Sequence, residues 1–164
     1  MNYHNITKDD MLNGDGLRVV LWVAGCTHRC DGCHNPETWD VASGIEFDSN
    51  AEEELFEALD KSHISGITFS GGDPLHPLNK DEVLRLAKKC KEKCPTKTVW
   101  LYTGFLFDEI KDSIDLSDID VLIDGEFKKE LNDNNLKWVG SSNQRIIDVQ
   151  ASLKEDKIVH FIKP

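Results

Sequence analysis

Three cysteines stand close together after an apolar run, and they are the side chains of this sequence best suited to chemistry. Cys26, Cys30 and Cys33 form a C-x3-C-x2-C group within eight positions. Three thiolates on one short loop can each bind a different iron of a [4Fe–4S] cube, which leaves the fourth iron without a protein ligand. An iron–sulfur catalyst needs such an open position, whereas a cluster that only carries electrons is normally held by four cysteines. The spacing therefore predicts a catalytic [4Fe–4S] cluster.

A structural zinc site is the alternative interpretation of the same cysteines. His28 or His34 could complete a Cys3His tetrahedron around one zinc ion. Structural zinc sites commonly pair two C-x2-C or C-x2-H units across a longer loop, and no second pair follows this compact group. The N-terminus carries no export signal, so an odd total of five cysteines indicates metal ligation more than disulfides.

The elements that must position this loop follow a strand–helix rhythm after residue 16. Strands are predicted at residues 17–25, 66–70, 98–103 and 120–124, with weaker candidates at 145–149 and 157–162. Helices are predicted around residues 51–59, from 79 to 93 and from 106 to 114, and Asn50 and Asn79 begin capping-box patterns. Strands that alternate with helices favour parallel pairing through right-handed crossovers.

Chain length limits the architecture that these elements can build. A complete eight-unit barrel usually takes about 250 residues, and 164 residues leave room for five or six strands. We therefore expect an α/β fold in which about five to six mostly parallel strands form an open, partial (βα) barrel. The whole chain, residues 1–164, is expected to be one domain, with a long polar loop at residues 128–144.

Chemically distinctive segments follow four successive predicted strands. They are residues 24–26 (AGC), 70–74 (SGGDP), 102–104 (YTG) and 124–127 (DGEF). Parallel α/β architectures place their sites at the carboxyl ends of the strands. The sequence therefore predicts that these four segments meet at one site.

The charge balance and hydropathy exclude two classes of partner. The chain carries 30 acidic and 19 basic residues, a net charge of −11, whereas a nucleic-acid-binding surface is normally basic. The longest apolar run, residues 19–26, is far shorter than the roughly 20 residues of a membrane span. We expect a cytoplasmic protein that binds neither nucleic acid nor a membrane.

The two remaining cysteines and two tryptophans have simpler interpretations. Cys90 and Cys94 fall on one stripe of the predicted second helix, where a buried free cysteine behaves as a small hydrophobe. We interpret them as packing residues rather than ligands of a second cluster. Trp22 and Trp100 lie in predicted strands and are likewise expected in the core.

Segments beyond the cysteines resemble the radical S-adenosylmethionine superfamily. Residues 13–18 (NGDGLR), 33–40 (CHNPETWD) and 70–75 (SGGDPL) are similar to its glycyl-radical-activating branch. Residues 102–104, 121–127 and 140–145 extend the similarity to the activating proteins of anaerobic ribonucleoside-triphosphate reductases, from residue 1 to about 149. Two positions depart from the pattern, because Gly32 replaces a frequent aromatic residue and Asp73 replaces the commoner Glu.

The resemblance implies two cofactors, a [4Fe–4S] cluster held by the three cysteines and S-adenosylmethionine. The implied contacts to S-adenosylmethionine are Gly32, Cys33, His34, Gly71, Gly72, Asp73, Thr103 and Gly104. Because Gly71 and Gly72 lack Cβ atoms, a ligand can approach the backbone of this turn, which would hold the methionyl ammonium. Thr103 and Gly104 would reach the ribose. An ordinary Gly-Gly turn is the alternative interpretation of residues 71–72.

Three polar residues near the predicted strand ends have open roles. Asp124 could orient substrate or cofactor, or it could cap a turn at the end of its strand. Asn143 and Arg145 are candidates for contact with a partner protein.

The resemblance also implies the reaction. A one-electron donor such as flavodoxin or ferredoxin would reduce the cluster, which would cleave S-adenosylmethionine to methionine and a 5′-deoxyadenosyl radical. That radical would take hydrogen from a glycine Cα of the large subunit of an anaerobic ribonucleoside-triphosphate reductase. No residue needs to act as a general base, so no catalytic side chain is assigned. The alternatives are a radical enzyme acting on a small nucleotide-like substrate and a non-enzymatic zinc-binding module.

Overall fold

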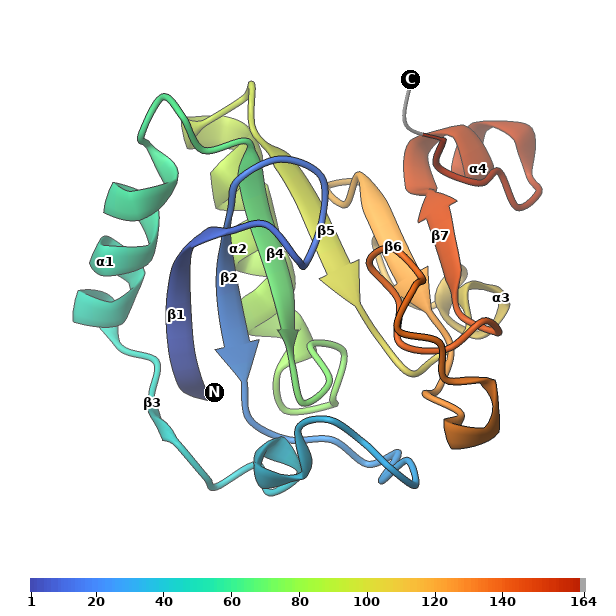
Figure 1. Cartoon of the computed structure of the whole chain (residues 1–164). Coiled ribbons are helices and arrows are strands. Elements are labelled where there is room, and N and C mark those ends of the chain that lie inside the picture. The colour runs from blue at the N-terminus through green and yellow to red at the C-terminus, as the bar shows by residue number, and fades with distance from the viewer. Residues whose placement is uncertain (163–164) are drawn as a thin grey trace.

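A single mixed sheet organises the computed structural model, which describes residues 1–162 (Figure 1). Its seven strands run in the order β3-β1-β2-β4-β5-β6-β7. The strands are β1 (Asn2–Asp10), β2 (Arg18–Val23), β3 (Ile45–Glu46), β4 (Gly66–Gly71), β5 (Thr98–Tyr102), β6 (Val121–Asp124) and β7 (Arg145–Asp148). The last two residues of the expected 1–164 domain lie outside the described residues.

The strand pairing divides the sheet into a parallel centre and antiparallel margins. β2, β4, β5 and β6 pair in parallel. β1 runs antiparallel to β2 and to β3, and β7 runs antiparallel to β6. The expected α/β class and the four central strands are confirmed. The prediction of five to six mostly parallel strands is wrong, because the open sheet has seven strands and antiparallel pairs at both margins.

The sequence pattern does not predict β1 because a bulge conceals its alternation. Its buried side chains, Tyr3 and Ile6, stand three positions apart rather than two. The register against β2 shifts between Tyr3 and Asn5, as an extra residue in one strand requires. A search for strict alternation of apolar and polar residues therefore misses this strand.

The helices match the predicted pattern in the first half of the chain and depart from it later. They are η1 (Pro36–Thr38), α1 (Ser49–Leu59), α2 (Lys80–Lys93), α3 (Phe107–Ile110), η2 (Lys129–Leu131) and α4 (Val149–Glu155). The predicted helix over 106–114 is wrong beyond Ile110, and the predicted strand over 157–162 is wrong, because only His160 bridges to Ile147 there. Among residues 1–162, every helix is too short or too polar to span a membrane.

The helix starts show which side chains cap them. Asp48, rather than Asn50, caps α1 and accepts a hydrogen bond from the backbone N–H of Ala51 at 2.9 Å. Asn79 does occupy the N-cap position of α2, but its side chain donates to the carbonyl of Ala24 at 2.7 Å instead. Asn79 therefore ties α2 to the end of β2.

Helix α2 lies behind the strands in Figure 1 and α1 stands beside β1, and the main core joins the side chains of both helices to those of the sheet. Cys90 and Cys94 are buried in this core, which confirms their interpretation as packing residues. On the opposite face, Trp100 forms a smaller cluster with Val121 and neighbouring aromatic side chains. Trp100 is therefore core, as expected. Trp22 is not, because it stays half-buried and lines the cleft described below.

A surface ion-pair network joins α1 to α2 and makes stability depend on pH. The carboxylate of Glu52 contacts Arg85 and Lys89, and Arg85 first and Lys89 next lower its pKa. A carboxylate with a lowered pKa stabilises the fold above its ordinary pKa, and the contribution disappears as pH falls through the lowered value.

We expect Glu52→Gln to lower the free energy of unfolding by about 0.5–1 kcal/mol at pH 7, since the network is partly exposed. Urea denaturation at pH 7 and at about pH 3 checks this, and the difference from wild type should be smaller at the lower pH. Glu54→Gln is the control, because Glu54 makes one exposed contact to Lys8 at 3.5 Å. An equal loss at both pH values would contradict the assignment.

Candidate functional site

The loop after β2 leaves the sheet at the carboxyl edge of the parallel strands and carries the three cysteines. Its two ends are joined by backbone hydrogen bonds. The N–H of Gly25 donates to the carbonyl of Thr38 at 2.6 Å, and the N–H of Cys26 donates to the carbonyl of Trp39 at 3.0 Å. The segment between them, hereafter the cysteine loop (residues 26–38), is therefore a loop whose two ends are held together where it leaves the sheet.

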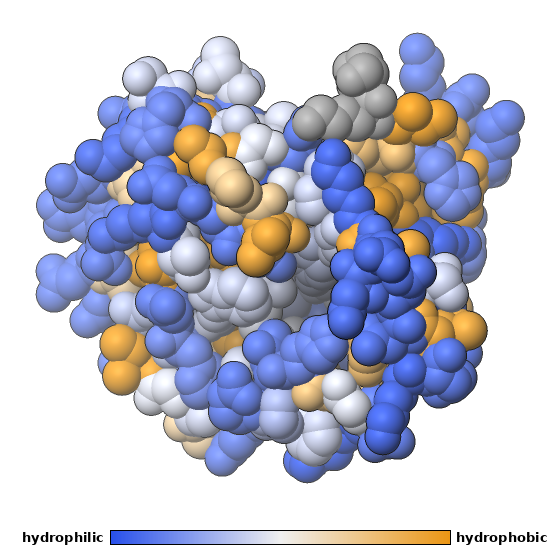
Figure 2. Space-filling view, in the orientation of Figure 1, coloured by the Kyte–Doolittle hydropathy of each residue, from blue (hydrophilic) through white to orange (hydrophobic). Residues whose placement is uncertain are grey.

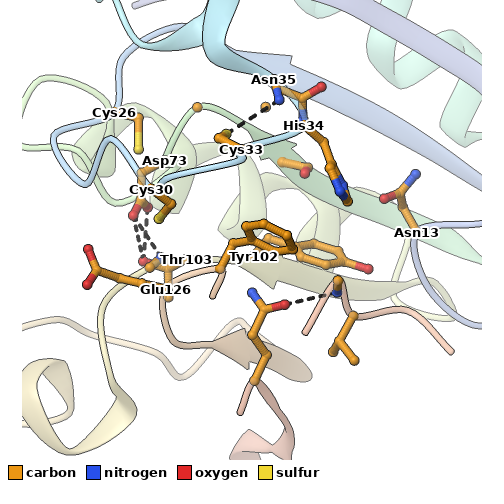
Figure 3. Close-up of a pocket in the computed structure, with 18 of the residues that line it drawn as sticks. Asn13, Cys26, Cys30, Cys33, His34, Asn35, Asp73, Tyr102, Thr103 and Glu126 are labelled. Carbon is orange, nitrogen blue, oxygen red and sulfur yellow. Dashed lines mark hydrogen bonds between the residues drawn. The ribbon is translucent and has the colours of Figure 1, made fainter. Parts of the chain in front are cut away.

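The cysteines of this loop are free, half-buried, and aligned along one cleft (Figure 3). The N–H of Cys33 donates to the carbonyl of Cys30 at 3.1 Å, which folds the two residues together. Burial raises the pKa of the Cys26 and Cys30 thiols. The protein surroundings alone thus do not favour these two thiolates, and a bound metal cation would supply the missing stabilisation.

The cleft has a volume of about 860 Å³, in the range of small-molecule sites. Figure 2 shows the surface hollowed near the middle of this face. The walls come from the carboxyl ends of the central strands, from the tip of the β1–β2 connection at residues 11–13, and from residues 135–140. The four distinctive sequence segments therefore meet at one site, as the sequence predicts.

Nearly all the predicted site residues line this cleft. They are Cys26, Cys30, Cys33, His34, Gly71, Gly72, Asp73, Thr103 and Gly104. Gly32 is the exception: it is exposed, and a Cβ atom there would lie 3.2 Å from the side chain of Lys129. Its contact with a cofactor stays a prediction that the cleft does not support.

The Gly71-Gly72 turn packs directly on the end of β2. A Cβ atom on Gly71, whose φ is +106°, would lie 2.5 Å from the backbone of Val23, and one on Gly72 would lie 2.5 Å from the carbonyl oxygen of Gly25. The missing Cβ atoms therefore leave room for the backbone of β2 and of Gly25, which approaches the turn closely. The turn lies beside the base of the cysteine loop, where both can face one ligand.

Asp73 follows this turn and is a buried acceptor, with 2% of its surface exposed. Its carboxylate accepts hydrogen bonds from the Thr103 hydroxyl at 2.9 Å, the Gly104 N–H at 3.0 Å and the Leu75 N–H at 2.8 Å. The polar groups of Thr103 and Gly104 that are predicted to reach a ribose are thus already engaged by Asp73. Their contact with a ribose stays a prediction.

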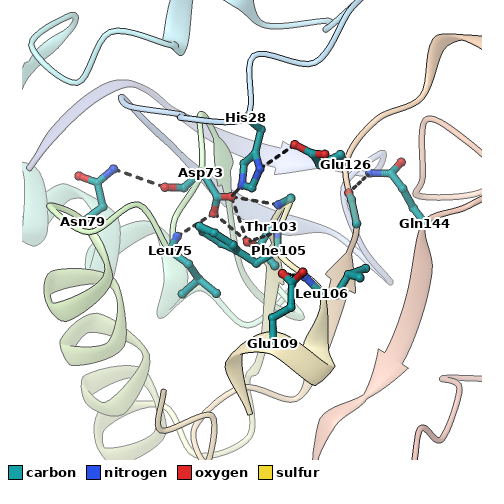
Figure 4. Close-up of polar contacts among 12 residues, drawn as sticks. His28, Asp73, Leu75, Asn79, Thr103, Phe105, Leu106, Glu109, Glu126 and Gln144 are labelled. Carbon is teal, nitrogen blue, oxygen red and sulfur yellow. Dashed lines mark hydrogen bonds and ion pairs between the residues drawn. The ribbon is translucent and has the colours of Figure 1, made fainter. Parts of the chain in front are cut away.

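His28 is a site residue that the sequence indicates only as a possible zinc ligand. Its Nε2 lies 2.7 Å from Asp73 Oδ2 and its Nδ1 lies 2.9 Å from Glu126 Oε2 (Figure 4). Asp73 first, and Glu126 with it, raise the pKa of His28. Both ring nitrogens face carboxylates, so His28 has no lone pair directed at a zinc ion. No sequence signal reveals these contacts, because the partners stand 45 and 98 positions away.

The three residues with open roles make contacts within the chain. Asp124 is fully buried and accepts from the backbone N–H of Phe107, the first residue of α3, at 2.8 Å and from Arg145 Nε at 3.0 Å. These contacts tie Asp124 to the start of α3 and to β7, and a role toward substrate or cofactor stays a prediction. Asn143 donates to the carbonyl of Glu126 at 2.8 Å. A partner contact for Asn143 or Arg145 stays a prediction.

The residues present fit a cluster shared among several thiolates better than a single ion. Within residues 1–162, no three His, Cys, Asp or Glu side chains are grouped to hold one metal ion. A cube does not require such convergence, because each thiolate binds a different iron. Trp39, which lines the cleft, has a buried indole N–H with no hydrogen-bond partner in the described part of the chain. Buried donors are normally paired, so this N–H is available to a bound acceptor.

Comparison with known proteins agrees with this geometry. Residues 12–147 match the family model of a 4Fe-4S single cluster domain. The chain is 46% identical over 146 residues to the anaerobic ribonucleoside-triphosphate reductase-activating protein of Enterobacteria phage T4, covering 89% of this chain and 93% of the phage protein. It is 43% identical over 150 residues to the proteins of the same name from Vibrio cholerae and Escherichia coli K12, covering 89% and 88% of this chain and 97% and 96% of theirs. The chain therefore belongs to the family of anaerobic ribonucleoside-triphosphate reductase-activating proteins.

Proposed function

We propose that this protein uses a [4Fe–4S] cluster and S-adenosylmethionine to generate a glycyl radical on an anaerobic ribonucleoside-triphosphate reductase. One observation carries the proposal. Cys26, Cys30 and Cys33 are free and line the same cleft as the Gly71-Gly72 turn, at the carboxyl edge of four parallel strands. The names of the relatives, which are reductase-activating proteins, support the choice of target.

In this proposal the chain's residues bind and orient, and the bound cofactors carry the chemistry. The three cysteines would hold three irons of the cluster and leave the fourth iron without a protein ligand. When bound, the cluster supplies one electron to the sulfonium of S-adenosylmethionine, whose cleavage gives the 5′-deoxyadenosyl radical that takes hydrogen from glycine. The Gly71-Gly72 turn offers backbone groups to the methionyl end, and the Trp39 N–H offers a donor to an acceptor on the bound cofactor. We propose that the open sheet is related to the partial barrels of radical S-adenosylmethionine enzymes.

The mouth of the cleft favours a polypeptide substrate over an enclosed small molecule. Met11 and Leu12 border it with 68% and 78% of their surface exposed. Exposed apolar side chains at the rim of a site are typical of surfaces that contact another protein. A glycine-bearing segment of the reductase is therefore the substrate that we propose, with a flavodoxin or ferredoxin as the electron donor.

Anaerobic incubation with the reductase large subunit, S-adenosylmethionine and a reductant tests this function. We expect a glycyl doublet in the electron paramagnetic resonance spectrum. We also expect one equivalent of 5′-deoxyadenosine for each glycyl radical formed. Deoxyadenosine without a doublet would instead indicate a small-molecule substrate. Zinc without iron or acid-labile sulfide in anaerobically purified protein would contradict the proposal and indicate a zinc-binding module.

A further inference from the structure

His28 lies in the cysteine loop between Cys26 and Cys30, and its side chain points back onto the sheet (Figure 4). Nε2 contacts Asp73 after β4 at 2.7 Å, and Nδ1 contacts Glu126 after β6 at 2.9 Å. Its own position follows β2. One ring thus joins the ends of three parallel strands at the edge where the cleft opens.

The acceptor on the β4 side is itself rigid. Asp73 is almost fully buried, and the Thr103 hydroxyl and the Gly104 N–H, both after β5, hold its carboxylate. A hydrogen bond to a buried, fully bonded carboxylate is stronger than one to a mobile surface group. His28 is therefore tied to a fixed point of the sheet.

The surroundings form a socket shaped for the imidazole ring. A Cβ atom on Gly104 would lie 2.5 Å from His28 Cδ2, so only glycine leaves room for the ring there. The Phe105 ring packs edge-on against it, with ring centroids 4.6 Å apart and an interplanar angle of 71°. His28 thus has room for its ring, an aromatic neighbour and two hydrogen-bond acceptors, although it is not a cluster ligand in this proposal.

We propose that His28 is a positioning residue that locks the cysteine loop onto the strand ends. By holding the loop in this position, His28 would fix how the unliganded iron of the cluster is oriented relative to the Gly71-Gly72 turn. Groups that orient metal ligands typically change affinity or activity 10- to 100-fold when removed. The part of the inference that concerns the cluster rests on the proposed function, whereas the docking of the loop does not.

Limited trypsin digestion of the metal-free full chain tests the docking alone. Arg29 is exposed and follows His28 in the loop, so cleavage after Arg29 reports how often the loop leaves the sheet. We expect His28→Ala to raise the cleavage rate about tenfold or more, because two hydrogen bonds to charged groups are lost. His63→Ala is the matched control, since it removes an exposed His–Asp9 pair at 2.8 Å whose residues do not line the cleft, and it should leave the rate unchanged.

Titration of the reduced, cluster-loaded protein with S-adenosylmethionine tests the effect on the site. We expect His28→Ala to keep wild-type iron and sulfide but to need about tenfold or more S-adenosylmethionine for the half-maximal change in its electron paramagnetic resonance spectrum. Glu126→Ala removes one acceptor from a half-exposed position, so it should fold normally and shift the titration in the same direction by less.

The outcomes separate the two proposals. A His28→Ala protein that matches His63→Ala in both assays overturns the positioning role. If His28→Ala does not fold, Glu126→Ala decides, and wild-type behaviour of that variant overturns the role. If wild-type protein binds no iron and sulfide, the proposed function fails, while the trypsin assay still decides whether His28 holds the loop.

Discussion

A Cys30→Ala variant is expected to fold normally, to retain no [4Fe–4S] cluster and to release no 5′-deoxyadenosine. Cys30 is half-buried on a loop outside the sheet, so its loss removes little packing. Two remaining thiolates cannot fix three irons of a cube, so the open iron loses its position. The deficit should exceed the roughly 10- to 100-fold cost of removing a group that only supports a ligand. Iron and sulfide quantification under argon, with product analysis, measures it.

Cys90→Ala is the matched control for this experiment. Cys90 is fully buried on α2 within the main core, and burial raises the pKa of its thiol to about 11. Its replacement should cost about 1 kcal/mol of stability and leave the iron content unchanged. Cluster retention by Cys30→Ala, or cluster loss by Cys90→Ala, would contradict the assignment of ligands.

The second large effect concerns stability at the other end of the strands. Arg18 opens β2 and is fully buried, and burial lowers its pKa to about 10. Its guanidinium donates to the hydroxyl of Thr68 at 2.8 Å, the carbonyl of Ile67 at 2.9 Å and the carbonyl of Thr98 at 2.8 Å, and it lies over the Trp100 ring. One side chain thus joins three neighbouring parallel strands.

We expect Arg18→Met to lower the free energy of unfolding by about 3 kcal/mol, because several buried acceptors lose their donor at once. Thermal unfolding should shift down by roughly 6–12 °C for a chain of this size. Cluster loading at low temperature should be unaffected, since Arg18 lies at the end of the sheet opposite the cysteine loop.

Arg85→Met is the control for Arg18→Met. Arg85 is half-exposed and pairs with surface carboxylates, so its loss should cost no more than about 1 kcal/mol. Equal destabilisation by the two substitutions would contradict the role assigned to Arg18. A neutral or stabilising Arg18→Met would show that the acceptors find other donors in its absence.

Local spacing in the sequence was enough to predict several parts of this protein. The C-x3-C-x2-C group, the apolar central strands and the order of strand and helix are all periodic or contiguous patterns. They suffice to place Cys26, Cys30, Cys33 and the Gly71-Gly72 turn at one edge, because parallel strands bring their carboxyl ends together. The comparisons then identified the family that these patterns resemble.

The antiparallel strands at the margins of the sheet could not be predicted from local sequence patterns. A bulge breaks the alternation of β1, and β7 returns beside β6 after a loop of about twenty residues without a crossover helix. Whether such a strand pairs in parallel or antiparallel depends on how its loop packs against the sheet. That packing is a sum of many weak contacts that no local pattern records.

The arrangement around His28 depends on how the strand ends meet in the folded chain. Asp73, Thr103 and Glu126 come from three different strand ends, and their side chains converge because the sheet fixes the distances between those ends. Gly104 reads as one more turn glycine in the sequence, yet its missing Cβ is what makes room for the imidazole. Contacts of this kind depend on side chains that meet across 45 to 98 positions, so the physical information that specifies them exists only once the chain has folded.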